Sequence, residues 1–142
     1  PFDYHRVNMT NYMNLTAQSP RNRFAEELEL SPYAQGMGAV GLPGDASSAS
    51  RFVRAAFMKW NSAAPAEEQA SVAQFFHILD SVAMIRGAVV TEQGTFDITT
   101  YSCCINGRTG VYYYKTYDNS HLRTIDMHQE NLDGDVLIIK AV

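Results

Sequence analysis

The chain has 142 residues, of which 46% are hydrophobic, and its formal net charge is −4 at pH 7. This length suits one ordinary domain or a part of a larger one, and the apolar fraction is sufficient for a core. No stretch approaches the roughly 20 apolar residues of a membrane-spanning helix. The acidic balance, without a basic cluster, argues against nucleic acid or a membrane surface as a partner.

The chain opens with Pro1-Phe2-Asp3-Tyr4, which has the character of the middle of a strand. Polar and apolar side chains alternate over residues 2–7, and this pattern predicts extended backbone there. The opening has neither an initiating Met nor the charged and apolar regions of a signal peptide. We therefore expect further sequence before Pro1 in the natural protein.

Residues 8–16 are predicted to form a short helix or turn, and residues 17–46 a long ordered loop. Loops of this length are more often functional than idle. Several glycines in the loop suggest unusual backbone angles or the close approach of another segment. They are Gly36, Gly38, Gly41 and Gly44.

Two helices are predicted next. The first starts near Ser47 or Ser48, which are good capping residues, and runs to about Trp60. The second begins around Pro65, because proline suits the first helical position, and Gly87 stands where a glycine that ends a helix is expected. It carries a broad apolar stripe made of Val72, Phe75, Phe76, Leu79, Val82 and Ala83.

The remaining residues have the pattern of an antiparallel meander. Strands over residues 95–104 and 110–117 flank an Asn-Gly pair, which is a strong hairpin signal. A third strand is predicted over residues 121–127 and a fourth over residues 136–139. Because strands and helices are segregated along the chain, the predicted fold class is α+β.

The spacing of cysteine and histidine argues against several kinds of site. Cys103 and Cys104 are neighbours in a predicted strand, so they face opposite sides and do not form a disulfide. This is compatible with a reducing cytoplasm, and no cation is evident nearby that would activate either thiol. The histidines, at positions 5, 77, 121 and 128, lack the spacing of metal ligands, and no metal or cofactor is expected.

Arg51 lies in the first turn of the first predicted helix, where the helix dipole already makes the potential positive. Arg54 follows three residues later, on the same side. Two guanidinium groups beside a glycine-rich loop form a candidate site for an anion or a thiolate. The alternative is that both are solvated surface arginines, which is the more common situation.

Three stretches, in this order, resemble signatures of one enzyme family. They are QGMGAVGLPGDASSASRFVR at 35–54, SVAQFFHIL at 71–79 and GVYYYKTYDN at 110–119, and the opening PFDYHRVNMTNYMNL is similar as well. The chain is therefore identified as resembling the C-terminal part of the bile salt hydrolases, or choloylglycine hydrolases. These are N-terminal nucleophile hydrolases related to the penicillin V acylases.

The resemblance implies a four-layer αββα sandwich, to which this chain would contribute two helices and the meander. It also implies a nucleophilic cysteine at a processed N-terminus, whose own α-amine, with a pKa of about 8, acts as the base. The thiol attacks an amide carbonyl, and water then hydrolyses the resulting thioester. Asparagine side chains and backbone N–H groups stabilise the oxyanion.

Arg51 alone maps onto a catalytic residue of the family, through the motif Ser50-Arg51-Phe52, where an arginine helps to hold the thiolate. Arg54 also matches the family pattern, and we expect it to be packing or surface. The family's nucleophile and its other catalytic residues belong to sequence before Pro1, and neither Cys103 nor Cys104 corresponds to that nucleophile. We therefore expect the 142-residue chain alone to be inactive and poorly stable without this missing N-terminal part.

The resemblance thus predicts hydrolysis of the amide bond of glycine- or taurine-conjugated bile acids in the bacterial cytoplasm, by a homotetramer or another homo-oligomer. The alternatives in this class are penicillin V or N-acyl homoserine lactone acylase activity, because loops in the missing half largely set substrate choice. A non-catalytic binding domain of the same fold is a rival that an N-terminal cysteine would argue against. A third reading makes Pro1 a catalytic amine, which its strand-like context disfavours.

Overall fold

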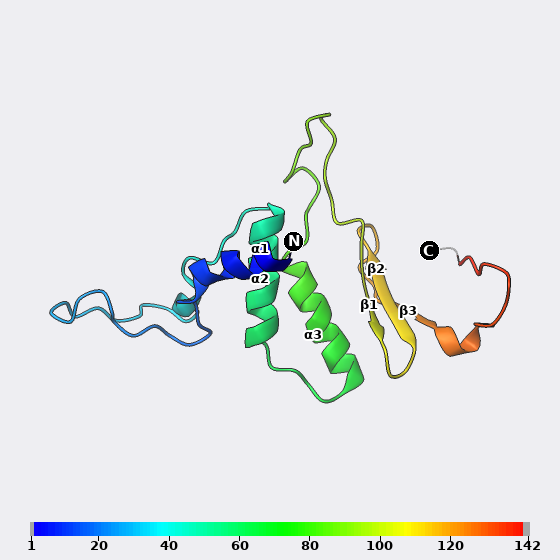
Figure 1. The fold of residues 1–142 in the computed structure, drawn as a ribbon, viewed down its shortest axis with the longest axis horizontal. Helices are drawn as coiled ribbons and strands as arrows, with labels where there is room; N and C mark the ends of the chain where they lie inside the picture. The colour runs from blue at the N-terminus through cyan, green and yellow to red at the C-terminus, as the bar shows by residue number, and fades with distance from the viewer. Residues whose placement is uncertain (1, 141–142) are drawn as a thin grey trace.

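The computed structural model describes residues 2–140, and Figure 1 shows the helices on one side of a small sheet. The helices are α1 (Phe2–Met9), α2 (Ser48–Asn61) and α3 (Glu68–Asp80), and the strands are β1 (Tyr101–Asn106), β2 (Val111–Thr116) and β3 (Arg123–Asp126). The helices precede all the strands, so the predicted α+β class is confirmed. None of the helices in this part of the chain has the length and apolar character needed to cross a membrane.

The opening segment is a helix, so the strand predicted over residues 2–7 is wrong. Asp3 in the first turn and Arg6 in the last turn complement the helix dipole. α1 packs on α2, where the ring of His5 stacks on that of Phe52 with centroids 4.0 Å apart. Six alternating residues are too few to separate the two periodicities, and here the contact with α2 favours the helix. The short helix or turn predicted over residues 8–16 is confirmed by the 3-10 turn Thr10–Tyr12.

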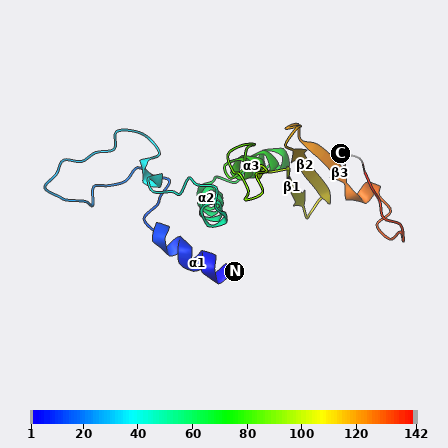
Figure 2. The same ribbon diagram turned by 90° about the horizontal axis from the view of Figure 1, so that it is seen from above.

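The long loop predicted over residues 17–46 is confirmed, and Figure 2 shows it reaching away from the helices. It contains one short 3-10 turn, Met37–Ala39. A Cβ at the buried Gly38 would collide with the backbone oxygens of Thr16 and Gln18, and the N–H of Thr16 donates to Gly38 O over 3.0 Å. Gly36 has a φ of 81°, which favours glycine. These two glycines confirm the predicted close approach and unusual backbone angle.

α2 begins where its sequence predicts. Ser47 is the N-cap, and its side chain accepts a hydrogen bond from the N–H of Ser50 over 3.4 Å. α3 starts at Glu68, three residues later than the predicted start at Pro65, because Glu67 at its N-cap has extended backbone.

α3 ends at Asp80, earlier than the apolar stripe suggested. The hydroxyl of Ser81 donates to Ile78 O over 2.6 Å, and the N–H of Ser81 binds carbonyls of the last turn. Val82 therefore lies beyond the helix. Gly87, with a φ of 89°, belongs to a later turn, so its predicted role in ending the helix is wrong.

The three strands form an antiparallel meander in the order β1-β2-β3, with Cys104 opposite Tyr113 and Tyr113 opposite Thr124. The predicted hairpin between β1 and β2 is confirmed. The side chain of Asn106 accepts a hydrogen bond from the N–H of Arg108 over 2.9 Å, which stabilises the turn.

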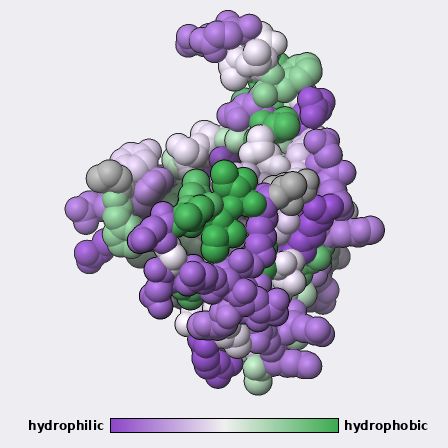
Figure 3. All heavy atoms as spheres, turned by 90° about the vertical axis from the view of Figure 1, so that its right-hand side faces the viewer, coloured by the Kyte–Doolittle hydropathy of each residue, from purple (hydrophilic) through white to green (hydrophobic). Residues whose placement is uncertain are grey.

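The fourth strand predicted over residues 136–139 is wrong. These residues have irregular backbone, and none of their side chains is buried. A strand needs a partner for its backbone groups, and in the described part of the chain no strand pairs with this segment. Figure 3 shows the side of the molecule that carries the sheet and the C-terminal segment. A hydrophobic patch is exposed on that side.

One face of α3 packs on the sheet through residues spaced by four. Val72 and Phe76 are buried there, between Glu68 at one end and Asp80 at the other. Glu68 Oε1 accepts a hydrogen bond from the hydroxyl of Tyr113 over 2.7 Å, and Lys115 Nζ lies 2.7 Å from Asp80. The spacing of four residues places all these groups on one side of the helix.

Candidate functional site

Arg51 projects from the first turn of α2 and is half-buried. Its Nε donates a hydrogen bond to Val82 O over 2.8 Å. Val82 follows the C-terminal end of α3, where backbone carbonyls carry a partial negative charge. Arg51 is therefore held against the segment that follows α3, and is not a fully solvated side chain.

Arg54 lies one turn further along α2 and binds Ser81, the residue before Val82 in the segment that follows α3. Its Nε donates to Ser81 O over 3.0 Å, while its Nη1 donates to Pro43 O over 2.8 Å and to Asp45 O over 3.1 Å. The two arginines therefore bind the consecutive carbonyls of Ser81 and Val82. Arg54 is half-buried, and its hydrogen bonds to two other segments agree with the packing role expected of it.

Asp45 organises the loop that leads into α2. Its carboxylate accepts hydrogen bonds from the N–H of Ser47 over 2.9 Å and from the hydroxyl of Ser50 over 2.5 Å. These bonds, first from Ser47 and then from Ser50, lower the pKa of Asp45 to about 2. The loop is thereby tied to the first turn of α2, from which Arg51 projects.

The guanidinium of Arg51 remains able to bind an anion. Within residues 2–140, its side chain forms a hydrogen bond through Nε alone. The Nη1 and Nη2 groups carry four further N–H donors, and a guanidinium stays charged at any ordinary pH. The arrangement can hold a permanent positive charge and several donors in one fixed orientation, which suits a carboxylate or a thiolate.

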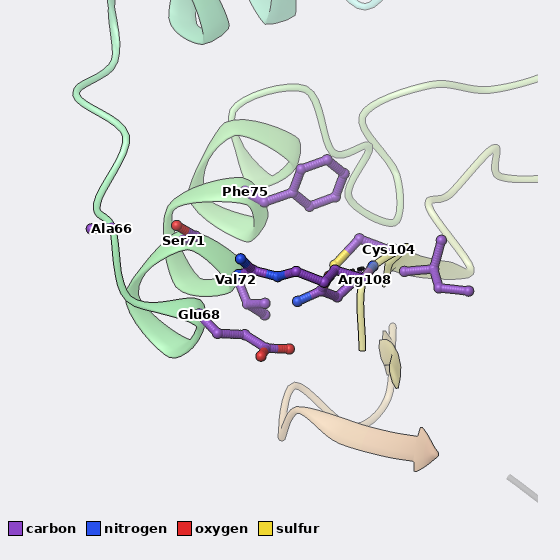
Figure 4. Close-up of a pocket in the computed structure, with 9 residues that line it drawn as sticks. Ala66, Glu68, Ser71, Val72, Phe75, Cys104 and Arg108 are labelled. Atoms are coloured by element: carbon purple, nitrogen blue, oxygen red, sulfur yellow. Dashed lines mark hydrogen bonds between the residues drawn. The ribbon is translucent and has the colours of Figure 1, made fainter. Parts of the chain in front are cut away.

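A separate cavity of about 320 Å³ lies between the start of α3 and the β1–β2 hairpin. Figure 4 shows Glu68 and Phe75 reaching it from α3, and Cys104 and Arg108 from the opposite side. Burial, followed by the influence of Cys103, raises the pKa of the Cys104 thiol. This thiol is less ionised than an ordinary one, which argues against Cys104 as a nucleophile.

The histidines do not gather with other ligands. Within the described range, no three His, Cys, Asp or Glu side chains are grouped as a metal site would require. His77 is exposed and not a core residue, while His5 lies against Phe52. Pro1, considered above as a catalytic amine, lies outside the described residues.

The sequence placed Arg54 beside Arg51 in a candidate anion site, the family resemblance gave it only a packing or surface role, and neither attached a function to Asp45. The signal available was the spacing of Arg51 and Arg54, which places both on one side of α2. The acceptors of Arg54 could not be predicted from the sequence, because they are backbone oxygens in two other segments.

Comparison with known proteins gives a consistent result for nearly the whole chain. Residues 1–140 match the family of linear amide C–N hydrolases described as the choloylglycine hydrolase family. The bile salt hydrolase/transferase of Lactiplantibacillus plantarum is 48% identical over 137 residues, which cover 96% of this chain and 42% of that protein. The protein of the same name from Clostridium perfringens is 41% identical over 135 residues, which cover 94% and 41%. The chain thus spans about two fifths of the length of the relatives it matches.

Solved structures agree with the sequence comparison. A mutant conjugated bile acid hydrolase from Clostridium perfringens superposes with a TM-score of 0.80 at 40% identity, covering 96% of this chain and 41% of that chain. Penicillin V acylase from Agrobacterium tumefaciens gives a TM-score of 0.65 at 19% identity, covering 90% and 34%, and so has the same fold. The chain belongs to the choloylglycine hydrolase family of linear amide C–N hydrolases.

Proposed function

We propose that the protein carrying this chain hydrolyses the amide bond between a bile acid and glycine or taurine, with Arg51 as a catalytic residue. The observation that carries the proposal is the fixed guanidinium of Arg51, whose Nε is anchored on Val82 O while its Nη groups remain available. Two relatives that match almost the whole chain bear the name bile salt hydrolase/transferase, which favours this substrate class.

In this proposal, residues 1–142 form the C-terminal part of one N-terminal nucleophile domain, and the nucleophilic cysteine lies outside them. The positive charge of Arg51 lowers the pKa of that cysteine and so favours its thiolate. The thiolate forms a bond to the amide carbon, and the C–N bond then breaks as the leaving amine takes a proton. Water hydrolyses the thioester, which releases the bile acid and regenerates the thiol.

The proposal also places the protein in the bacterial cytoplasm, as a homo-oligomer. Cys103 and Cys104 are both unpaired, which suits a reducing compartment.

The test compares Arg51→Ala and Arg51→Lys with the unmodified full-length protein, using the release of glycine from glycocholate and of taurine from taurocholate. We expect Arg51→Ala to lower kcat/KM by roughly a hundredfold, as the loss of one preorganised electrostatic group does elsewhere. The acid limb of the pH profile should also move to higher pH, because the thiol loses a neighbouring cation. Lys59→Ala is the matched control, since Lys59 is an exposed cation further along α2 and lies over the ring of Trp60.

Two results would overturn the proposal. One is an unmodified protein that releases neither glycine nor taurine, including one that cleaves penicillin V instead. The other is an Arg51→Ala variant with the kcat/KM and pH profile of the unmodified protein, which would remove Arg51 from the catalytic machinery.

A further inference from the structure

We propose that Arg54 is a positioning residue for Arg51: it holds the loop before α2 and the segment after α3 in the one arrangement that orients the guanidinium of Arg51. This inference rests on the proposed function, because it assigns Arg54 a role only through the catalytic role of Arg51. Arg54 itself needs no contact with the substrate.

Arg54 joins three segments of the chain. It projects from α2, and its Nη1 donates to Pro43 O and Asp45 O in the preceding loop. Its Nε donates to Ser81 O, which is 27 residues away in sequence and lies just beyond α3. No other side chain in residues 2–140 forms hydrogen bonds that join these three segments.

The acceptor of Arg51 is next in sequence to an acceptor of Arg54. Ser81 O receives Arg54 Nε, and Val82 O receives Arg51 Nε over 2.8 Å. The peptide plane of Ser81 O includes the N and Cα of Val82, and Val82 O follows on the next plane, so a movement of the Ser81 carbonyl is passed to the Val82 carbonyl. Loss of Arg54 would therefore shift the anchor of Arg51 without removing it.

A second route runs through the loop. Arg54 fixes the backbone of Asp45, and the carboxylate of Asp45 accepts hydrogen bonds from Ser47 and Ser50. Ser47 O in turn accepts the backbone N–H of Arg51 over 2.9 Å. Both the backbone and the side-chain end of Arg51 are thus connected to Arg54 by short hydrogen-bonded paths.

The geometry of these bonds requires a guanidinium. Arg54 uses two different nitrogens, Nε and Nη1, to reach acceptors in two segments. Lysine keeps the charge but concentrates its donors on one nitrogen at the end of a flexible stem, so it cannot reproduce this fork. Arg54→Lys is therefore the informative substitution, because it changes the geometry and keeps the charge.

The test uses the full-length protein and measures kcat, KM and the pH profile for glycocholate. We expect Arg54→Lys to lower kcat by about tenfold to a hundredfold, since a displacement of about 1 Å in a catalytic group can cost that much. The acid limb of the profile should move to higher pH, as in Arg51→Ala but by less. KM should change little, because Arg54 does not contact the substrate.

A double-substitution experiment separates positioning from a general loss of structure. In an Arg51→Ala background, Arg54→Lys should lower kcat by less than about twofold, because the group that it positions is already absent. Asp80→Asn is the matched control. It weakens the same end of α3 by removing the ion pair with Lys115 on the sheet side, and it should leave the acid limb where it is.

The inference is overturned if Arg54→Lys lowers kcat by the same factor in both backgrounds, or if it leaves the acid limb unchanged. Should Arg54→Lys not fold, Asp45→Ala serves in its place, since it cuts the loop route while Arg54 stays. Its kcat should then fall only when Arg51 is present, and an equal fall in both backgrounds would sink the inference. Full activity in Arg51→Ala would instead refute the role of Arg51 itself, so the two failures are distinguishable.

Discussion

On its sheet side, α3 is held through its own side chains, whereas on its α2 side the segment that follows the helix is held through backbone carbonyls. On the sheet side, Glu68 and Asp80 pair with Tyr113 and Lys115 across the buried ring of Phe76. At the α2 side, Arg51 and Arg54 bind the carbonyls that follow the helix. The difference matters because a carboxylate titrates in the accessible pH range, while neither a guanidinium nor a carbonyl does.

The two sides of α3 should therefore respond differently to pH. Arg51 Nε and Arg54 Nε each bind a neutral backbone carbonyl, so these two bonds do not depend on a titrating carboxylate. On the sheet side, protonation of the Glu68 carboxylate would weaken the hydrogen bond that it accepts from Tyr113. The two arginines are therefore held on the side of α3 where the acceptors are backbone carbonyls.

The largest effect is expected from Phe76→Ala, which removes the centre of the sheet-side contact. Phe76 is 5% exposed, and truncation of a buried phenylalanine typically costs about 3–5 kcal/mol of unfolding free energy. Phe75→Ala is the control, since Phe75 is the next residue on the helix and is 40% exposed. Denaturant unfolding of both variants checks this, and equal losses would mean that the sheet side of α3 is not the buried one.

A smaller effect is expected on the other side from Ser47→Ala, which removes the N-cap of α2. Loss of such a cap costs about 1 kcal/mol. Ser48→Ala is the matched control, because Ser48 is an exposed residue in the first turn of the same helix, where alanine is tolerated. Thermal melts of the two variants compare the cap with its neighbour. A Ser48→Ala variant as destabilised as Ser47→Ala would contradict the observed start of α2.

The smallest effect is expected from Glu68→Gln, and it should depend on pH. Hydrogen bonds, first from Tyr113 and then from Asn106 and Thr109, lower the pKa of Glu68 below its ordinary value of 4.5. A lowered folded-state pKa contributes stability that is present above the unfolded pKa and is lost as pH falls through the folded one.

Unfolding free energies measured from pH 7 down to pH 3 test this difference. The unmodified protein should lose stability more steeply below about pH 4.5 than Glu68→Gln does. Glu67→Gln is the control, since Glu67 is exposed and its side chain makes no cap hydrogen bond. Identical slopes for Glu68→Gln and the unmodified protein would show that this carboxylate does not contribute to the pH response.

Much of the fold was predictable where the signal lies within a few residues. The cap at Ser47, the hairpin after Asn106 and the close approach at Gly38 each depend on one side chain, or on the lack of one, at a fixed position. The two wrong strands, over residues 2–7 and 136–139, are short segments whose patterns fit more than one structure. Contacts with α2 favour a helix in the opening segment, and the segment 136–139 has no paired strand in the described residues.

The candidate site also has one part that the sequence predicts and one part that it does not. The position of Arg51 in the first turn of a helix made it electrostatically unusual from sequence alone. The partners of both arginines were not predictable, because their acceptors are carbonyls at positions 43, 45, 81 and 82. Every residue carries such a carbonyl, so the sequence contains no mark that distinguishes these four.

The α+β class, the start of α2 and the unusual cation at Arg51 can be derived from the amino-acid sequence, since caps, turns and charges are properties of side chains. The helical opening segment and the bonds of Arg51 and Arg54 to the segment after α3 are visible only in the folded chain. Those outcomes depend on which backbone groups come together in space. That arrangement is set by the packing of distant segments and not by any local pattern of residues.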